Sequence, residues 1–199
     1  MNKLPLEFYQ RSDVVQISQE LLGKVLCTNI GGELTSGIIT ETEAYCGRGD
    51  KACHANNNTR TNRTEIMYRA GGNAYVYLCY GIHHLFNVVT NKKDLADAIL
   101  IRAIEPVDGI ETILERRGFD ESEPKLTAGP GRMTQALGIT TNIHDGTDLL
   151  GDIIWIEDRN ISLAKTDITA TKRIGVDYAG EDANLPWRFI IKDNKWVSQ

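Results

Sequence analysis

Short strand-like runs joined by tight turns dominate this chain and restrict the folds that it can adopt. The runs occupy residues 25 to 29, 34 to 45, 73 to 80, 83 to 90, 98 to 104, 153 to 157 and 188 to 192, with a last one near Trp196. Gly31-Gly32 separates the first two runs and Tyr80-Gly81 the next two, as in β-hairpins. Because strands and helices do not alternate regularly, we predict an α+β fold with a mostly antiparallel sheet.

Helical patterns are fewer. Asp13 and Gln16 resemble a capping box, and the apolar spacing that follows ends at Gly23. Residues 108 to 117 and 129 to 138 predict two more helices, and residues 62 to 69 a short one. These helices should lie at the periphery of the sheet.

Length and patterning favour one domain over residues 1 to 199, since no internal repeat or linker is visible. The longest strongly apolar block, residues 74 to 80, is too short to cross a membrane. Residues 1 to 11 lack the apolar core of a signal peptide. We expect an intracellular monomer in the cytoplasm or nucleoid of a bacterial cell, with no membrane attachment. In a reducing compartment its four cysteines should be free thiols.

One strand carries candidate catalytic groups. Glu41, Glu43 and Tyr45 alternate along it, so their side chains share a face. That face leads into a long loop, residues 46 to 62, rich in Gly, Asn, Thr and Arg and containing His54. Carboxylates beside such loops are candidates for a general base. The alternative is a solvent-facing sheet edge, which a Glu-Thr-Glu triplet alone would favour.

Three of the seven tyrosines lie within residues 75 to 80. Tyr75 and Tyr77 share a strand face, and Tyr80 precedes Gly81 at a turn that could hold it outward as a wedge. For this segment alone, cross-strand aromatic packing explains the pattern equally well.

Charge limits the choice of partner. The net charge is −5 with pI near 5.4, so a nucleic acid would need a local basic face. Cations gather in the long loop and further along, and the candidate phosphate contacts are Arg60, Arg63, Lys172 and Arg173. The cysteine spacing of structural zinc and the glycine patterns of nucleotide-binding loops are both missing. We expect no metal and no cofactor.

Several blocks resemble the alkyladenine (3-methyladenine) DNA glycosylases. They are ETEAY at 41 to 45 with Asp50 and His54, AYVYLCYG at 74 to 81 with Asn87, LIRAIEP at 100 to 106, GPGRMTQALGI at 129 to 139, and KRIGVDYAGE at 172 to 181 with PWRF and WVS. The blocks run in order over nearly the whole chain. The resemblance implies a curved, open-barrel antiparallel sheet similar to the C-terminal domain of methionyl-tRNA formyltransferase, without metal or cofactor.

The resemblance also implies an activity. A member of this family flips an alkylated purine, such as 3-methyladenine or 7-methylguanine, out of duplex DNA and hydrolyses its N-glycosidic bond. Hypoxanthine and ethenoadenine are further candidate substrates. The abasic site that remains is a substrate for base excision repair.

Roles carry over to matching positions. Glu43 matches the general base and Arg102 the arginine that holds the attacking water and the nucleotide backbone. The pocket walls match Tyr45, Tyr77 and His54, the wedge matches Tyr80, and Asn87 matches the residue that crowds the 2-amino group of guanine. Glu41 receives no chemical role beyond that of a structural partner for the loop.

Two other functions stay open. A non-catalytic nucleic-acid-binding module on the same fold would suit the low pI, although Glu43 and Arg102 are both present. A carbohydrate glycosidase that uses Glu41 and Glu43 would leave the tyrosine wedge and the basic loop without a purpose.

Overall fold

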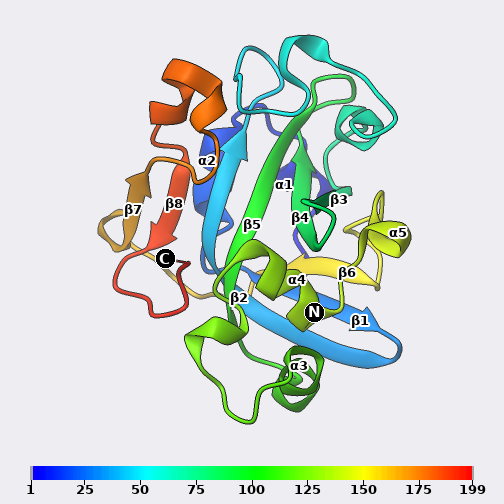
Figure 1. The fold of residues 1–199 in the computed structure, drawn as a ribbon, viewed down its shortest axis with the longest axis vertical. Coiled ribbons are helices and arrows are strands. Elements are labelled where there is room, and N and C mark those ends of the chain that lie inside the picture. The colour runs from blue at the N-terminus through cyan, green and yellow to red at the C-terminus, as the bar shows by residue number, and fades with distance from the viewer. Residues whose placement is uncertain (1, 199) are drawn as a thin grey trace.

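An eight-stranded antiparallel sheet runs through the computed structural model, which describes residues 2 to 198 (Figure 1). Its strands are β1 (Val25–Ile30), β2 (Glu33–Tyr45), β3 (Ala74–Cys79), β4 (His83–Thr90), β5 (Asp97–Pro106), β6 (Ile154–Glu157), β7 (Ile168–Thr171) and β8 (Arg188–Ile191). The order is β3-β4-β5-β2-β1-β6, while β8 pairs with β2 and β7 with β8. With the helices below, this confirms the predicted α+β class.

The long strand β2 organises the sheet. It pairs with β5 along most of its length, with β1 through residues 33 to 38, and with β8 through residues 41 to 43. One edge of β2 therefore serves two different strands in succession. In Figure 1, β1 and β6 run nearly across the view while β5 and β8 run along its long axis, so the sheet is strongly bent.

The helices cover the sheet from outside. They are α1 (Leu6–Tyr9), α2 (Val14–Glu20), α3 (Ile110–Arg117), α4 (Pro130–Leu137) and α5 (Thr141–His144). Short 3-10 turns are η1 (Asn56–Asn58), η2 (Glu65–Tyr68), η3 (Pro124–Leu126), η4 (Lys165–Asp167) and η5 (Asp177–Asn184). The predicted cap of α2 is present, since the Asp13 side chain accepts a hydrogen bond from the Gln16 amide at 2.9 Å.

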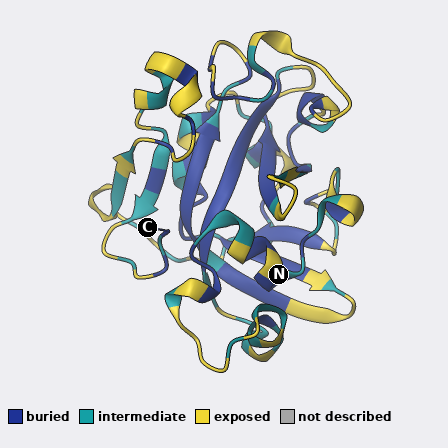
Figure 2. Ribbon diagram, in the orientation of Figure 1, coloured by how far each residue is buried: buried dark blue, intermediate teal, exposed yellow. Residues whose placement is uncertain are grey.

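Two apolar clusters support the site. The main core joins the sheet to α2 and α4 through residues such as Ile17, Ile101 and Met133. A smaller cluster lies under the loop between β2 and β3 and contains Cys53, Ala55, Met67, Tyr68, Tyr75, Val89, Ala96 and Ala98. Figure 2 shows the central strands buried and the loops around them exposed. The long loop is thus anchored on the sheet by its own core.

The prediction of a strand near Trp196 is wrong. The Trp196 ring is buried in the main core, and its carbonyl accepts a hydrogen bond from Thr40 Oγ1 at 3.0 Å. However, the Trp196 amide donates to the Asn194 side chain at 2.8 Å, so this segment forms a local turn and does not pair with a strand. The sequence patterns also missed α1, α5 and β7, each only four residues long. Over residues 2 to 198, no helix combines the length and apolarity needed to cross a bilayer.

Candidate active site

A bulge in the pairing of β2 with β5 orients the charged side chains of the site toward one another. Ile39 faces Ile104, Glu41 faces Ala103 and Thr42 faces Ile101, so Arg102 is skipped in the register. Bulges of this kind redirect a side chain and are common beside active sites. Here the bulge brings Arg102 onto the carboxylates of Glu41 and Glu43, at 2.8 Å and 3.3 Å. Both carboxylates are fully buried, which excludes the solvent-facing edge.

Glu43 is held by three groups. Its Oε2 accepts a hydrogen bond from the Tyr45 hydroxyl at 2.7 Å and lies 3.3 Å from Arg102 Nη1. Its Oε1 accepts from the backbone amide of Ile174 at 2.8 Å. Tyr45, Arg102 and Ile174 all line the neighbouring cavity, so Glu43 lies directly behind the cavity wall.

That cavity has a volume of about 410 Å³, within the range of roughly 300–1,000 Å³ typical of small-molecule sites. It brings together Tyr45, His54, Tyr77, Tyr80, Asn87 and Arg102, all of which the sequence marked as site residues. The lining also includes Ala52, Cys53, Arg63, Met67, Tyr75, Leu78, Cys79, Leu85, Ala98, Leu100, Ile174, Gly175, Val176 and Tyr178. Tyr75 had no role in the predicted site, although its two-residue spacing from Tyr77 places both rings on one face of the strand.

Aromatic rings form one wall of the cavity. The ring centroids of Tyr75 and Tyr77 are 5.4 Å apart, and His54 meets Tyr77 edge-on at 4.7 Å. The Tyr75 hydroxyl and His54 Nδ1 are hydrogen-bonded at 3.0 Å. The Asn87 side chain, on the next strand, donates to the Tyr75 carbonyl at 3.1 Å. Such a wall offers a flat ligand several aromatic surfaces and few charges.

His54, Tyr45 and Tyr75 stay neutral near pH 7. Burial, and then the nearby Arg63 guanidinium, lower the pKa of His54 to about 4. Burial raises the pKa of Tyr75 to about 12, and burial followed by the charge of Glu43 raises the pKa of Tyr45 well above its usual value. A neutral imidazole and protonated phenols therefore line the cavity.

The lowered pKa of His54 predicts that the stability of the fold depends on pH. The unfolded imidazole binds a proton near pH 6.5 and the folded one only near pH 4, so folded-state stability is lost as pH falls between these values. The loss should reach about 3 kcal/mol at most. Urea unfolding at pH 7 and pH 4.5 should show a smaller pH effect in His54→Gln than in wild type. The exposed His83→Gln serves as control, and equal pH effects in His54→Gln and wild type would contradict the shift.

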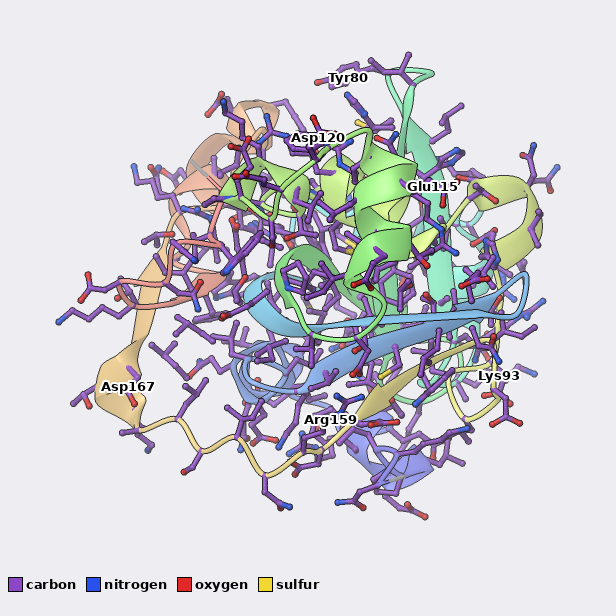
Figure 3. All side chains as sticks on the ribbon, turned by 90° about the horizontal axis from the view of Figure 1, so that it is seen from below. Tyr80, Lys93, Glu115, Asp120, Arg159 and Asp167 are labelled. Carbon is purple, nitrogen blue, oxygen red and sulfur yellow. The ribbon has the colours of Figure 1, made fainter. Side chains whose placement is uncertain are left out.

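Tyr80 stands at the tip of the β3–β4 hairpin, at the mouth of the cavity. It is 91% exposed and projects away from the body of the protein in Figure 3. Tyr80 and Gly81 both have positive φ, 51° and 74°, and the Ile82 amide closes the turn on the Cys79 carbonyl at 3.1 Å. An aromatic residue in this conformation is strained, and strain of this kind gathers at functional sites. The turn therefore holds the ring outward, as the sequence predicted.

The basic face differs from the prediction. Placing Arg173 on an exposed face is wrong, because its side chain is fully buried and forms a bidentate pair with Asp50 at 2.6 and 2.8 Å. Its guanidinium also lies 4.8 Å from the Tyr45 ring centroid and 5.2 Å from that of Trp187. Arg173 thus supports the cavity wall from behind.

The other three cations are exposed. Arg60 pairs with Glu65 and Asp94 at 2.6 and 2.9 Å, which offsets its charge. Arg63 lies over the Tyr77 ring, 4.9 Å from its centroid, and its Nη2 is 3.4 Å from His54 Nε2. Lys172 donates to the Asn184 side chain at 2.5 Å. Of the three, Arg63 is the one that lines the cavity.

A second hollow of about 800 Å³ opens beside the first and shares Cys79, Tyr80, Leu85 and Arg102 with it. It extends past the start of α4 to the segment 195 to 198. Lys125, Arg132 and Lys195 line it, against one acidic residue, Glu123. These cations could not be found from the sequence, because they come from three separate segments.

The site holds no cluster of metal ligands and no disulfide within the residues that the structure describes. Among residues 2 to 198, no three or more His, Cys, Asp or Glu side chains gather closely enough to hold a metal ion. The four cysteines are free, as predicted. An aromatic cavity with a buried carboxylate behind it and an exposed tyrosine at its mouth suits an enzyme that acts on a flat ring.

Comparison with known proteins identifies that class of enzyme. A family model described as Methylpurine-DNA glycosylase (MPG) matches residues 7–195. Proteins named "Putative 3-methyladenine DNA glycosylase" are similar along their whole length: that of Natranaerobius thermophilus is 44% identical over 98% of both chains, and that of Chlamydia felis is 48% identical over 96% of this chain and 97% of its own. The chain belongs to the methylpurine-DNA glycosylase family. It is a hydrolase that cleaves bases from DNA in base excision repair.

Proposed function

We propose that this protein removes alkylated purines, 3-methyladenine first among them, from duplex DNA by hydrolysing the N-glycosidic bond. One observation carries the proposal: the buried carboxylate of Glu43 contacts three residues that line an aromatic cavity at the foot of an exposed tyrosine. The relatives carry 3-methyladenine in their names, which agrees with this substrate. Hypoxanthine and ethenoadenine are further candidates.

Glu43 activates the attacking water. In the free protein, the Tyr45 hydroxyl and Arg102 Nη1 lie beside its Oε2. When the nucleotide enters, a water binds against Glu43 Oε2 beside Arg102, and Glu43 accepts its proton as the oxygen attacks the anomeric carbon. The negative charge of Glu43 also stabilises the oxocarbenium character that the sugar gains as the bond breaks.

The cavity suits a positively charged base. A purine alkylated at N3 or N7 carries a positive charge, which the electron-rich faces of Tyr45 and Tyr77 attract. Because His54 is neutral near pH 7, it adds no repulsion. The cationic base leaves the sugar without prior protonation, so a site with one general base is sufficient. Asn87, which lines the cavity, crowds the 2-amino group of normal guanine.

The duplex lies across both hollows, and the protein acts on it as a monomer. Tyr80 fills the gap that the flipped nucleotide leaves, and its stacking offsets part of the few kcal/mol that flipping costs. Phosphates of the lesion strand lie near Lys125, Arg132 and Lys195 in the second hollow. Arg63, which lines the cavity, and Lys172 contact the backbone as well.

Single-turnover base release tests the proposal. Duplex oligonucleotides containing 7-methylguanine, hypoxanthine, ethenoadenine or normal guanine, and methylated duplex DNA as the source of 3-methyladenine, are incubated with the protein in EDTA. We expect release of the alkylated purines and none of guanine. Tight lesion binding without release would favour a non-catalytic binding module, and loss of release in EDTA would contradict a metal-free mechanism.

Tyr80→Ala should impair flipping without harming the fold. Aromatic stacking on a base is worth about 1 to 3 kcal/mol, so the single-turnover rate below saturation should fall about 10- to 100-fold. Because the ring is 91% exposed, the free energy of unfolding should stay within about 0.5 kcal/mol of wild type. Ile143→Ala, on α5 and 76% exposed, is the control. An unchanged release rate in Tyr80→Ala would exclude the wedge.

A further inference from the structure

Glu41 takes no part in the reaction proposed above, yet its carboxylate is fully bonded beside the cavity. It is fully buried and accepts four hydrogen bonds: from Arg102 Nε at 2.8 Å, Arg188 Nε at 2.6 Å, and the amide and hydroxyl of Ser198 at 2.7 and 2.8 Å. A buried carboxylate is costly unless donors compensate it. The fold supplies those donors from β5 and, far along the sequence, from β8 and the segment 194 to 198 that follows it.

These contacts fix the orientation of Arg102. A guanidinium is planar, so the direction of one edge determines that of the others. Nε of Arg102 is bound to Glu41, and Nη2 lies 3.5 Å from the Ser198 hydroxyl. Nη1 is then directed at Glu43 Oε2, 3.3 Å away. Glu41 and Ser198 together define where the Arg102 charge lies relative to Glu43.

The charges of the cluster are balanced. Two carboxylates, Glu41 and Glu43, face two guanidinium groups, Arg102 and Arg188. Arg188 binds Glu41 and also donates to the Ser198 carbonyl at 2.9 Å, so it closes the cluster from the β8 side. If Glu41 lost its charge, Glu43 would be the remaining carboxylate partner of Arg102. The guanidinium would then shift onto Glu43 and fill the place that the attacking water needs.

The segment 194 to 198 is therefore part of the site. Trp196 is buried in the core, which holds Ser198 within reach of Glu41. Val197 and Ser198 also line the second hollow, beside Arg102. Ser198 thus brings the segment next to Arg102, at the edge of the reaction site.

We propose that Glu41 and Ser198 are positioning residues that hold Arg102 for catalysis, an inference that rests on the proposed function. They act through Arg102, and neither touches the flipped base or the reacting atoms. Their loss should slow the chemical step, because misplacing a catalytic group by about 1 Å can cost about 10²-fold in rate. Lesion binding should change little, since the aromatic cavity and Tyr80 are untouched.

The test separates rate from binding. Single-turnover base release at saturating enzyme and the Kd for lesion duplex are measured for Glu41→Gln, Ser198→Ala and Ser198→Thr. We expect release to fall about 100-fold in Glu41→Gln and about 10-fold in Ser198→Ala, with Kd within about 3-fold of wild type. Ser198→Thr keeps the hydroxyl and should restore most of the rate. Ser162→Ala, an exposed serine, is the matched control.

The outcomes are distinct. If wild type releases base and Ser198→Ala releases it at the same rate, the positioning role is wrong while the proposed function stands. A Ser198→Thr variant as slow as Ser198→Ala would lead to the same conclusion. If the variants lose release rate and lesion affinity to the same extent and also unfold at a lower urea concentration, then Glu41 and Ser198 only stabilise the fold, which contradicts the positioning role. If wild type itself releases no base, the proposed function fails and the positioning role fails with it. If Glu41→Gln does not fold, Ser198→Ala still tests the proposal, because the loss of one hydroxyl is too small a change to unfold the protein.

Discussion

Replacing Glu43 with glutamine should lower the single-turnover rate of base release about 10²- to 10⁴-fold, the span that general-base catalysis contributes. The amide keeps the size of the side chain and can still accept a hydrogen bond from the Ile174 amide. It cannot take the proton of the attacking water or stabilise the developing positive charge on the sugar. Quenched-flow or manual sampling of the released base under single-turnover conditions measures the rate.

Lesion binding should survive the same change. The cavity wall, Asn87 and Tyr80 are intact in Glu43→Gln, so the Kd for a lesion duplex should stay within about 10-fold of wild type. The matched control is Glu111→Gln, the same substitution at an exposed glutamate of α3, and it should retain the full rate. A Glu43→Gln enzyme that releases base at the wild-type rate would remove Glu43 from the mechanism.

Asp50→Asn should lower the free energy of unfolding by about 3 to 5 kcal/mol, the usual cost of leaving one partner of a buried ion pair uncompensated. Asp50 and Arg173 are both buried, and the pair is bidentate. The Asp50 side chain also accepts hydrogen bonds from the amides of Cys46 and Ala52, which order the start of the long loop. Urea unfolding monitored by tryptophan fluorescence measures the change.

An exposed ion pair gives the comparison. Asp152 is 93% exposed at the side chain and pairs with Lys3 at 2.6 Å. Asp152→Asn should change the unfolding free energy by no more than about 1 kcal/mol. Similar effects of the two substitutions would mean that the Asp50–Arg173 pair contributes no more to stability than a surface contact does.

The sequence predicted the parts of the fold that local chemistry decides. The hairpins at Gly31-Gly32 and Tyr80-Gly81, the Asp13 cap and the helix that begins at Pro130 follow from turn and cap residues, and all are present. The four-residue elements α1, α5 and β7 were missed because their stability comes from contacts with other segments. The strand β7, for example, pairs with β8 alone.

The site residues also divide into those that local sequence patterns predict and those whose position depends on distant segments. Alternation placed Glu41, Glu43 and Tyr45 together, and the hairpin turn placed Tyr80 outward. The burial of Arg173 could not be foreseen, because its partner Asp50 lies 123 residues away. The bulge that directs Arg102 depends on how β2 and β5 are registered, and neither strand alone specifies that. The role of Glu41 likewise appears only when Arg188 and Ser198 are folded onto it.

A crystal structure of Glu43→Gln bound to a duplex with a single ethenoadenine or hypoxanthine would test the central claim most directly. We predict a modified base rotated out of the helix and lying among Tyr45, His54 and Tyr77, with its anomeric carbon facing residue 43. The Tyr80 ring should fill the gap in the stack. A base that remains stacked in the duplex, with the aromatic cavity empty and Tyr80 outside the helix, would contradict the account.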